Sequence, residues 1–205
     1  EQALVVETPL AKIDNVYSME FDGLNDSISL GNSTITGTTY SVSLWFKSTE
    51  ASIDRFEVLS EKIPNVGSQF AYRIYIYTSG NLELLGQQTS GTAYNDGQWH
   101  NVVIIQDPSQ PSGKTGRGFV DGNLVTETNS ANNTSGSSDF FIGSRSGTSN
   151  FFKGQIDEVA VFNYALTDEE ILDIYNSTVV VGGVNKTADL NDLTTPPVKW
   201  YRMGD

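Results

Sequence analysis

One stretch of the chain, FKGQIDEVAVFNYALTDEEI (residues 152–171), holds the acids whose types and spacing could do chemistry. Asp157 and Glu158 stand side by side in a run of β-forming residues. Retaining glycoside hydrolysis uses two carboxyl groups about 5 Å apart that face one cleft. Adjacent residues of a strand point to opposite faces, so these two acids are not expected to form such a pair. No catalytic residue is predicted from them.

Two other segments could belong to an enzyme, and neither has the required pattern. His100 is the only histidine, and it lies in GQWHNVVIIQ, a run that is apolar on both faces like a central strand. No nucleophile-elbow motif accompanies it, so a framework histidine is the favoured interpretation. The segment GKTG (residues 113–116) lacks the spacing of a phosphate-binding loop. We therefore predict a protein that is not an enzyme.

The composition limits the partners further. The 205-residue chain has 25 Asp and Glu against 12 Lys and Arg, which gives a formal net charge of −13. Such a field repels nucleic acid and anionic membrane surfaces, so neither is an expected partner. The absence of cysteine excludes disulfides and thiolate metal sites. No run approaches the roughly 20 apolar residues that span a bilayer, so no membrane insertion is expected.

The elements that must position these residues are mostly strands. Short runs of β-branched and aromatic residues recur between clusters of Gly, Asn, Ser and Asp, which is typical of an antiparallel sandwich. In TYSVSLWFKS, for example, Tyr40, Val42, Leu44 and Phe46 alternate onto one face. Asp121-Gly122 suits a hairpin turn. The prediction is an all-β fold of two antiparallel sheets.

One segment near the C-terminal end predicts a short helix. Thr167 is suited to the N-cap position, and Glu170 three residues later completes a capping box. Leu166 and Ile171 can form the hydrophobic staple that accompanies such a start. The acids of this segment are therefore interpreted as helix-capping residues, and the helix is expected to end near Asn176.

The ordered set of these segments resembles a known family. MEFDGLNDSISL, YSVSLWFKS, GQWHNVVII, GFVDGNLV, FFIGSRSG and FKGQIDEVAVFNYALTDEEI follow one another as in laminin G-like, concanavalin A-like jelly-roll domains. The resemblance implies a jelly roll of two antiparallel sheets, usually non-catalytic, that binds glycans or proteins. Many members hold a calcium ion.

A calcium site is the cofactor prediction. Strand alternation would put Asp157 on one face with Val159 and Val161, where a carboxylate needs hydrogen-bond donors or a cation. The turn FDGLND supplies oxygen ligands from Asp22 and Asn25. The resemblance implies that these strands meet, so the three polar residues could share a structural Ca²⁺. In the alternative, Asp157 accepts backbone N–H bonds from the turn without an ion.

Candidate ligand-binding residues are aromatic or cationic. Trp45 shares a strand face with a serine and a lysine, while Arg73, Tyr75 and Tyr77 share a face of another strand. If these faces line a concave sheet, the rings and cation suit sugars and carboxylates. Arg145 lies in a polar loop that could border the site. The alternative is that the aromatic rings pack in the core or cover a sheet.

The segmentation and function follow from these patterns. Residues 1–16 are interpreted as an N-terminal extension, 17–178 as the domain, and 179–205 as a docking tail or the start of a further module. The leading hypothesis is an extracellular or cell-surface module that binds carbohydrate. The alternative is a structural or protein-interaction module of a virion, such as a phage structural protein, a fibre or a surface assembly, with tandem modules or oligomers.

Overall fold

The structure is a computed structural model that describes residues 10–32, 35, 37–51, 55–62, 70–129, 139–177, 179–181 and 184–203. The strands of its first half are β1 (Lys12–Asp14), β2 (Met19–Asp22), β3 (Ile28–Asn32), β4 (Tyr40–Lys47), β5 (Arg55–Lys62), β6 (Phe70–Tyr77), β7 (Leu82–Leu84), β8 (Gln87–Gln88) and β9 (His100–Gln106). They are followed by β10 (Gly116–Val120), β11 (Asn123–Thr128), β12 (Asp139–Ile142), β13 (Lys153–Phe162), α1 (Asp168–Asn176), β14 (Val179–Val181), β15 (Val184–Ala188), the 3₁₀-helix η1 (Leu190–Asp192) and β16 (Lys199–Tyr201).

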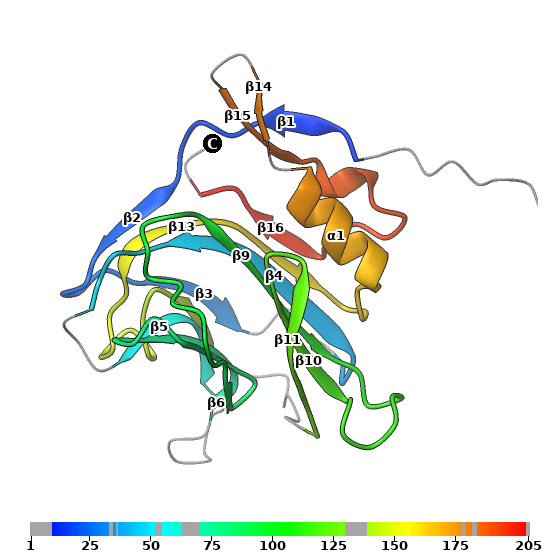
Figure 1. The fold of residues 1–205 in the computed structure, drawn as a ribbon, viewed down its shortest axis with the longest axis horizontal. Helices are drawn as coiled ribbons and strands as arrows, with labels where there is room; N and C mark the ends of the chain where they lie inside the picture. The colour runs from blue at the N-terminus through cyan, green and yellow to red at the C-terminus, as the bar shows by residue number, and fades with distance from the viewer. Residues whose placement is uncertain are drawn as a thin grey trace, which may run out of the picture.

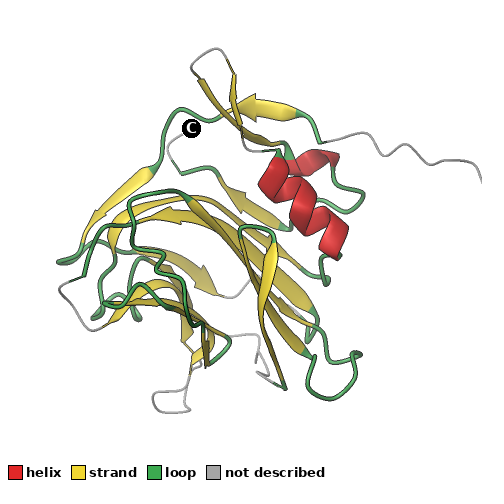
Figure 2. Cartoon of the chain, in the orientation of Figure 1, coloured by secondary structure: helices red, strands yellow, loops and turns green. Residues whose placement is uncertain are grey.

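Two antiparallel sheets face each other and form a sandwich (Figures 1 and 2). The seven-stranded sheet has the order β11-β10-β9-β4-β13-β16, with β2 also paired to β13. The six-stranded sheet has the order β3-β12-β5-β6-β7-β8, and a third sheet, β1-β15-β14, is small. This arrangement, with its single α-helix among the described residues, confirms the predicted fold class.

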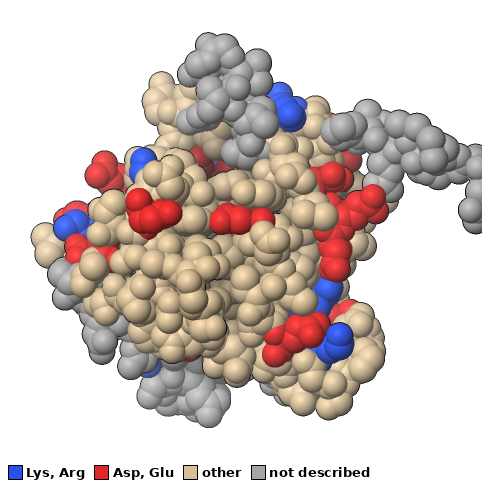
Figure 3. All heavy atoms as spheres, viewed as in Figure 1, with Lys and Arg blue, Asp and Glu red and all other residues tan. Residues whose placement is uncertain are grey.

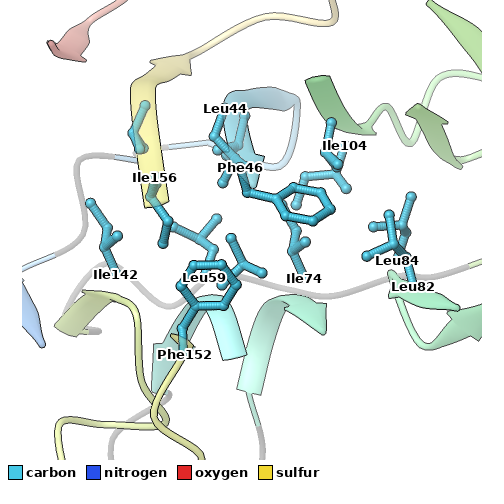
Figure 4. Close-up of a cluster of buried hydrophobic side chains, with 14 of the residues drawn as sticks. Leu44, Phe46, Leu59, Ile74, Leu82, Leu84, Ile104, Ile142, Phe152 and Ile156 are labelled. Atoms are coloured by element: carbon cyan, nitrogen blue, oxygen red, sulfur yellow. The ribbon is translucent and has the colours of Figure 1, made fainter. Parts of the chain in front are cut away.

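Alternating apolar residues fill the space between the two large sheets. Tyr40, Val42, Leu44 and Phe46 of β4 are fully buried there, as the sequence pattern predicted. They meet residues of the six-stranded sheet and of β13, and Phe152, which directly precedes β13, packs edge-on against Phe46 (Figure 4). Burial of this apolar surface is the main source of stability of the sandwich.

A second apolar layer lies on the outer face of the seven-stranded sheet, which α1 covers (Figure 1). The predicted capping box is present: the Thr167 hydroxyl accepts from the Glu170 N–H, and the Glu170 carboxylate accepts from the Thr167 N–H. Ile171 and Ile174 of α1 are buried against Phe162 and other residues of this sheet face. Among the described residues, no helix is both long and apolar enough to cross a membrane.

β13 connects the early and late parts of the chain. It pairs with β4 along one edge, and with β2 and then β16 along the other. The register shifts between Asp157 and Ala160, and Glu158 has a φ of 52°, so the strand carries a β-bulge. The bulge corrects the predicted alternation: Val159 and Val161 point into the inter-sheet core, whereas Asp157 lies opposite Trp45 on the outer face.

The segments outside residues 17–178 also pack on the sandwich. β1 pairs with β15, and the Ala11 N–H donates to the carboxylate of Asp192. β16 extends the edge of the seven-stranded sheet, and the Arg202 guanidinium donates to the carbonyl of Asp14. The structure therefore places residues 10–14 and 184–203 together on one side of the domain.

A glycine in β13 sets how closely this strand approaches β4. A Cβ at Gly154, whose φ is +143°, would lie 2.2 Å from the backbone oxygen of Lys47. We expect Gly154→Ala to lower the free energy of unfolding by about 3 kcal/mol, since it adds overpacking to backbone strain. Gly86→Ala is the matched control, because Gly86 has a φ of +77° and nothing within 4 Å. It should cost about 1 kcal/mol. Urea unfolding measures both, and equal losses would contradict this packing.

Candidate functional site

The bulge of β13 places two carboxylates on the same outer side of the sheet. The prediction that Asp157 and Glu158 point to opposite faces is therefore wrong, because it assumed regular alternation. Asp157 Oδ1 accepts from the N–H of Glu158 at 2.8 Å. Glu158 accepts from the Trp200 indole N–H at 2.5 Å and from Arg202 Nε at 3.5 Å. Both acids are 4% exposed and do not line an open cleft, and Glu158 joins β16 to β13 through Trp200 and Arg202.

Burial changes the proton affinity of Glu158. Loss of solvation, together with the nearby charge of Asp157, raises the pKa of Glu158 from 4.5 to about 7. The hydrogen bond from Trp200 and the charge of Arg202 act in the opposite direction. The carboxyl group therefore changes its charge near neutral pH at the point where β16 docks.

His100 joins two turns at one end of the sandwich. Its Nδ1 lies 2.7 Å from Asp121 Oδ2, and its Nε2 lies 3.2 Å from Asp96 Oδ1. Burial opposes protonation of the imidazole, but the hydrogen bonds and charges of Asp121 and Asp96 together raise the pKa of His100. Because both ring nitrogens face carboxylates, neither is positioned to activate a nucleophile.

The turn that follows β2 uses its acids locally. Asp22 Oδ1 accepts from the N–H groups of Leu24 at 2.7 Å and Asn25 at 3.4 Å. Asp26 Oδ2 accepts from the N–H of Asp22 at 2.8 Å. These bonds satisfy the backbone of the turn and fix its shape.

The structure pairs the two strands of the predicted calcium site but does not bring its ligands together. Asp22 lies opposite Lys153 in the β2–β13 ladder. Asp157 is four residues further along β13, so about 13 Å of strand separates it from Asp22. Within the described part of the chain, no group of three or more His, Asp or Glu residues could hold a metal ion. Asp22, Asn25 and Asp157 therefore do not fit one ion, and calcium binding remains a prediction.

Trp45 is not on an open surface. Its ring stacks on Tyr175 of α1, with centroids 5.9 Å apart and planes inclined by 16°, and the side chain is 8% exposed. Ser43 and Asn101 lie beside it on the same sheet face, and the Asn101 amide donates to both Ser43 Oγ and the Leu44 carbonyl. The helix therefore covers this part of the face, and Trp45 helps to hold α1 in place.

The predicted tyrosines lie on the outer face of the six-stranded sheet. Ile74 and Ile76 of β6 point into the core, so Tyr75 between them faces outward. Tyr75 lies opposite Glu57 of β5 on one side and Glu83 of β7 on the other. Glu83 in turn lies opposite Gln88 of β8. Four polar or aromatic residues thus form one row across four strands: Glu57, Tyr75, Glu83 and Gln88.

Exposure differs along this row. Glu57 and Tyr75 are buried, whereas Glu83 is half-buried and Gln88 is exposed. Tyr77 is half-buried next to the row, and its hydroxyl donates to the carboxylate of Glu83. The accessible part of the face therefore combines a phenol ring, a carboxylate and a primary amide.

The two cationic residues predicted to bind a ligand, Arg73 and Arg145, lie in different elements of the fold. Arg73 belongs to β6, where its backbone pairs with Ser60. Arg145 lies in the loop between β12 and β13, where it forms an isolated bridge with Ser149. The end of this loop reaches the row, because the carbonyl of Asn150 accepts from the N–H of Glu57 at 3.0 Å.

Sequence reasoning missed Glu57, Glu83 and Gln88. Alternation in LEL, with Leu82 and Leu84 in the core, would have placed Glu83 outward. The row itself depends on which strands are neighbours and in what register. That pairing brings together residues from distant parts of the chain, and a single sequence does not display it.

The comparisons with known proteins identify the family. The model of the concanavalin A-like lectin/glucanases superfamily matches residues 21–172, and the chain belongs to this superfamily. This result confirms the resemblance inferred from the sequence. No curated protein matches the chain.

Solved structures show the same fold at low sequence identity. The fourth domain of AbnA, an extracellular GH43 arabinanase of Geobacillus stearothermophilus, was solved with arabinotriose; it is 19% identical with a TM-score of 0.57, over 82% of this chain and 81% of that one. The CBM40 of the Ruminococcus gnavus IT-sialidase, bound to α2,3 sialyllactose, is 15% identical with a TM-score of 0.56, over 82% and 100%.

A Trypanosoma rangeli sialidase in complex with the inhibitor DANA is 12% identical, with a TM-score of 0.63 over 77% of this chain. The match spans only 27% of the sialidase chain. At such identities these similarities show the fold alone, and they assign no ligand to this chain.

The raised pKa of Glu158 predicts how the stability of the fold depends on pH. When the pKa of a carboxyl group is higher in the folded state than in the unfolded state, protonation of that group stabilises the folded state. The contribution of Glu158 to stability is therefore greatest below pH 4.5 and is lost as the pH rises to about 7. The loss amounts to about 3 kcal/mol over that interval.

We expect Glu158→Gln to flatten this part of the stability profile, since the amide oxygen can still accept from Trp200. Urea unfolding at pH 4.5, 5.5 and 7 measures the slope. Glu169→Gln, at an exposed position of α1, is the control and should keep the wild-type slope. An unchanged slope in Glu158→Gln would show that Glu158 does not titrate in this range.

The calcium prediction can be tested by thermal unfolding with calcium and with chelator. If the ion binds at the FDGLND turn, calcium raises the melting temperature, and Asp22→Asn abolishes the increase. Asp157→Asn should preserve the increase, because Asp157 lies opposite Trp45, away from the turn. Loss of the effect in Asp157→Asn alone would contradict this geometry, and identical wild-type curves would reject calcium binding.

Proposed function

We propose that this chain is a non-catalytic carbohydrate-binding module and that its glycan lies on the outer face of the six-stranded sheet. The observation that carries the proposal is the row from Glu57 through Tyr75 and Glu83 to Gln88, which the strand register sets across four strands. Neighbouring strands are about 4.8 Å apart, so the accessible part of this face, from Tyr77 of β6 to Gln88 of β8, is about 10 Å long. One or two sugar rings have this length.

The chemistry of the face supports a sugar ligand. A half-buried tyrosine ring offers a flat apolar surface on which the C–H face of a sugar can rest. The Glu83 carboxylate accepts hydrogen bonds from hydroxyl groups, and the Gln88 amide both donates and accepts. Glu57 and Tyr75 continue the row on the neighbouring strands and are buried, so their positions are fixed. Few rearrangements are then needed for binding, which limits its entropic cost.

Two similar structures support a glycan as the partner. The AbnA domain was solved with arabinotriose, and the CBM40 was solved with α2,3 sialyllactose. Such ligands are found outside cells or on cell surfaces, so we propose an extracellular or cell-surface location. The proposal gives the chain no catalytic residue and needs no calcium in the binding step.

A glycan array tests the proposal, followed by titration of the best ligand. Tyr77→Ala should weaken binding about tenfold, because it removes the ring and the bond that orients Glu83. Glu83→Gln should have a comparable effect through loss of charge-assisted hydrogen bonds. Tyr17→Ala is the matched control: Tyr17 is 63% exposed and lies outside the six-stranded sheet, so affinity should not change.

Two results would count against the proposal. A folded wild-type protein that binds nothing on the array would favour the alternative of a structural or protein-interaction module in a virion or surface assembly. Binding that survives both Tyr77→Ala and Glu83→Gln would place the glycan elsewhere on the molecule.

A further inference from the structure

A second row of polar and aromatic residues lies on the opposite side of the sandwich. On the outer face of the seven-stranded sheet, Lys47 of β4 lies opposite Gln155 of β13, and Gln155 lies opposite Glu20 of β2. The β4–β9 register pairs Phe46 with His100, so its continuation sets Trp99 beside Lys47. The N–H of Gly97 donates to the Ser48 carbonyl at 2.9 Å, which holds the segment before β9 next to the segment after β4.

The neighbouring residues show on which face of the sheet this row lies. Phe46 and Ile156 are in the inter-sheet core, and the His100 ring lies against Phe46. The adjacent residues Lys47, Gln155 and Trp99 therefore belong to the other face. One step along the same face, Trp45 is covered by α1 through Tyr175.

The row of Trp99, Lys47 and Gln155 is less covered than Trp45. Trp99, Lys47 and Gln155 are each half-buried, so solvent reaches all three. Their positions across three neighbouring strands span about 10 Å, the extent of one or two sugar rings.

Lys47 supplies a half-buried positive charge to this surface. In the described part of the chain, the Lys47 ammonium has no ion-pair partner, as is also true of the exposed Lys12 and Lys199, whereas Lys153 pairs with Glu50 at 3.0 Å and Arg202 with Glu158 at 3.5 Å. In Figure 3, basic side chains are few and scattered, and acids gather along the side where Figure 1 shows α1. Because Lys47 is half-buried, its charge is less screened by solvent than that of an exposed lysine, and it can attract an anion on a chain of net charge −13.

The other two side chains complete a polar and apolar contact surface. The Gln155 amide Nε2 donates to Ser18 Oγ at 3.2 Å, which directs its carbonyl oxygen to other donors. Gly154 allows β13 to approach the Lys47 backbone closely, so Lys47 and Gln155 have a fixed spacing. The half-buried Trp99 side chain adds a flat apolar surface, the indole ring.

We propose that Trp99, Lys47 and Gln155 form a second binding site, and that its ligand is a sugar that carries a carboxylate. The indole packs on the apolar face of the ring, the ammonium pairs with the carboxylate, and the Gln155 carbonyl accepts from a hydroxyl group. This site and the row on the six-stranded sheet lie on opposite outer faces. Each can therefore be present without the other.

Titration with glucuronate and with uncharged glucose, followed through the Trp99 indole N–H resonance, tests this site. The wild-type protein should bind glucuronate at least tenfold more tightly than glucose, and added salt should reduce the difference. Lys47→Gln should abolish the preference, and Trp99→Ala should weaken glucuronate binding about tenfold, as measured by calorimetry. Lys47→Gln changes a half-exposed side chain, so it keeps the test valid if Trp99→Ala fails to fold.

The control variant Lys12→Gln removes an exposed positive charge from β1, which belongs to the small third sheet, and should leave the preference for glucuronate unchanged. Absence of any Trp99 shift with glucuronate, equal binding of the two sugars, or an unchanged preference in Lys47→Gln would each overturn the proposal. An equal loss of preference in Lys12→Gln and Lys47→Gln would also overturn it, because the effect would then come from the net charge. Failure of this site therefore differs from failure of the proposed function, which depends on Tyr77 and Glu83.

Discussion

The hydrogen-bonded ladder of β13 is the constraint on which the rest of the structure depends. This strand holds β4 on one edge and both β2 and β16 on the other. The bulge at Asp157 and Glu158 separates the two parts of the second edge and gives β16 its anchor through Trp200.

The two outer faces of the sandwich have different roles because different elements cover them. On the seven-stranded sheet, α1 and the C-terminal segment bury a large part of the outer face, and the row at Lys47 stays partly accessible. On the six-stranded sheet, the accessible outward residues Tyr77, Glu83 and Gln88 are polar or aromatic. A flat polar sheet face next to a rigid core is a suitable surface for an extended ligand, since the scaffold need not rearrange.

Local patterns predicted the elements, and long-range pairing decided the sites. Alternation in β4 and the capping box at Thr167 involve neighbouring residues, so the sequence displays both. The bulge has no such signal: the residue with positive φ is Glu158, where a glycine or asparagine would have indicated it. That one shift reversed the interpretation of Asp157. The rows at Tyr75 and Lys47 likewise depend on strand registers that are fixed only when distant segments meet.

The central functional claim is that the outer face of the six-stranded sheet binds the glycan. The most direct measurement is a map of backbone amide chemical shifts during titration with the best array ligand. The account predicts that changes concentrate at Tyr75, Tyr77, Glu83 and Gln88 and leave the turn at Asp22 unaffected. Changes confined to that turn and to the loop of residues 143–150, with none in β6 to β8, would contradict it.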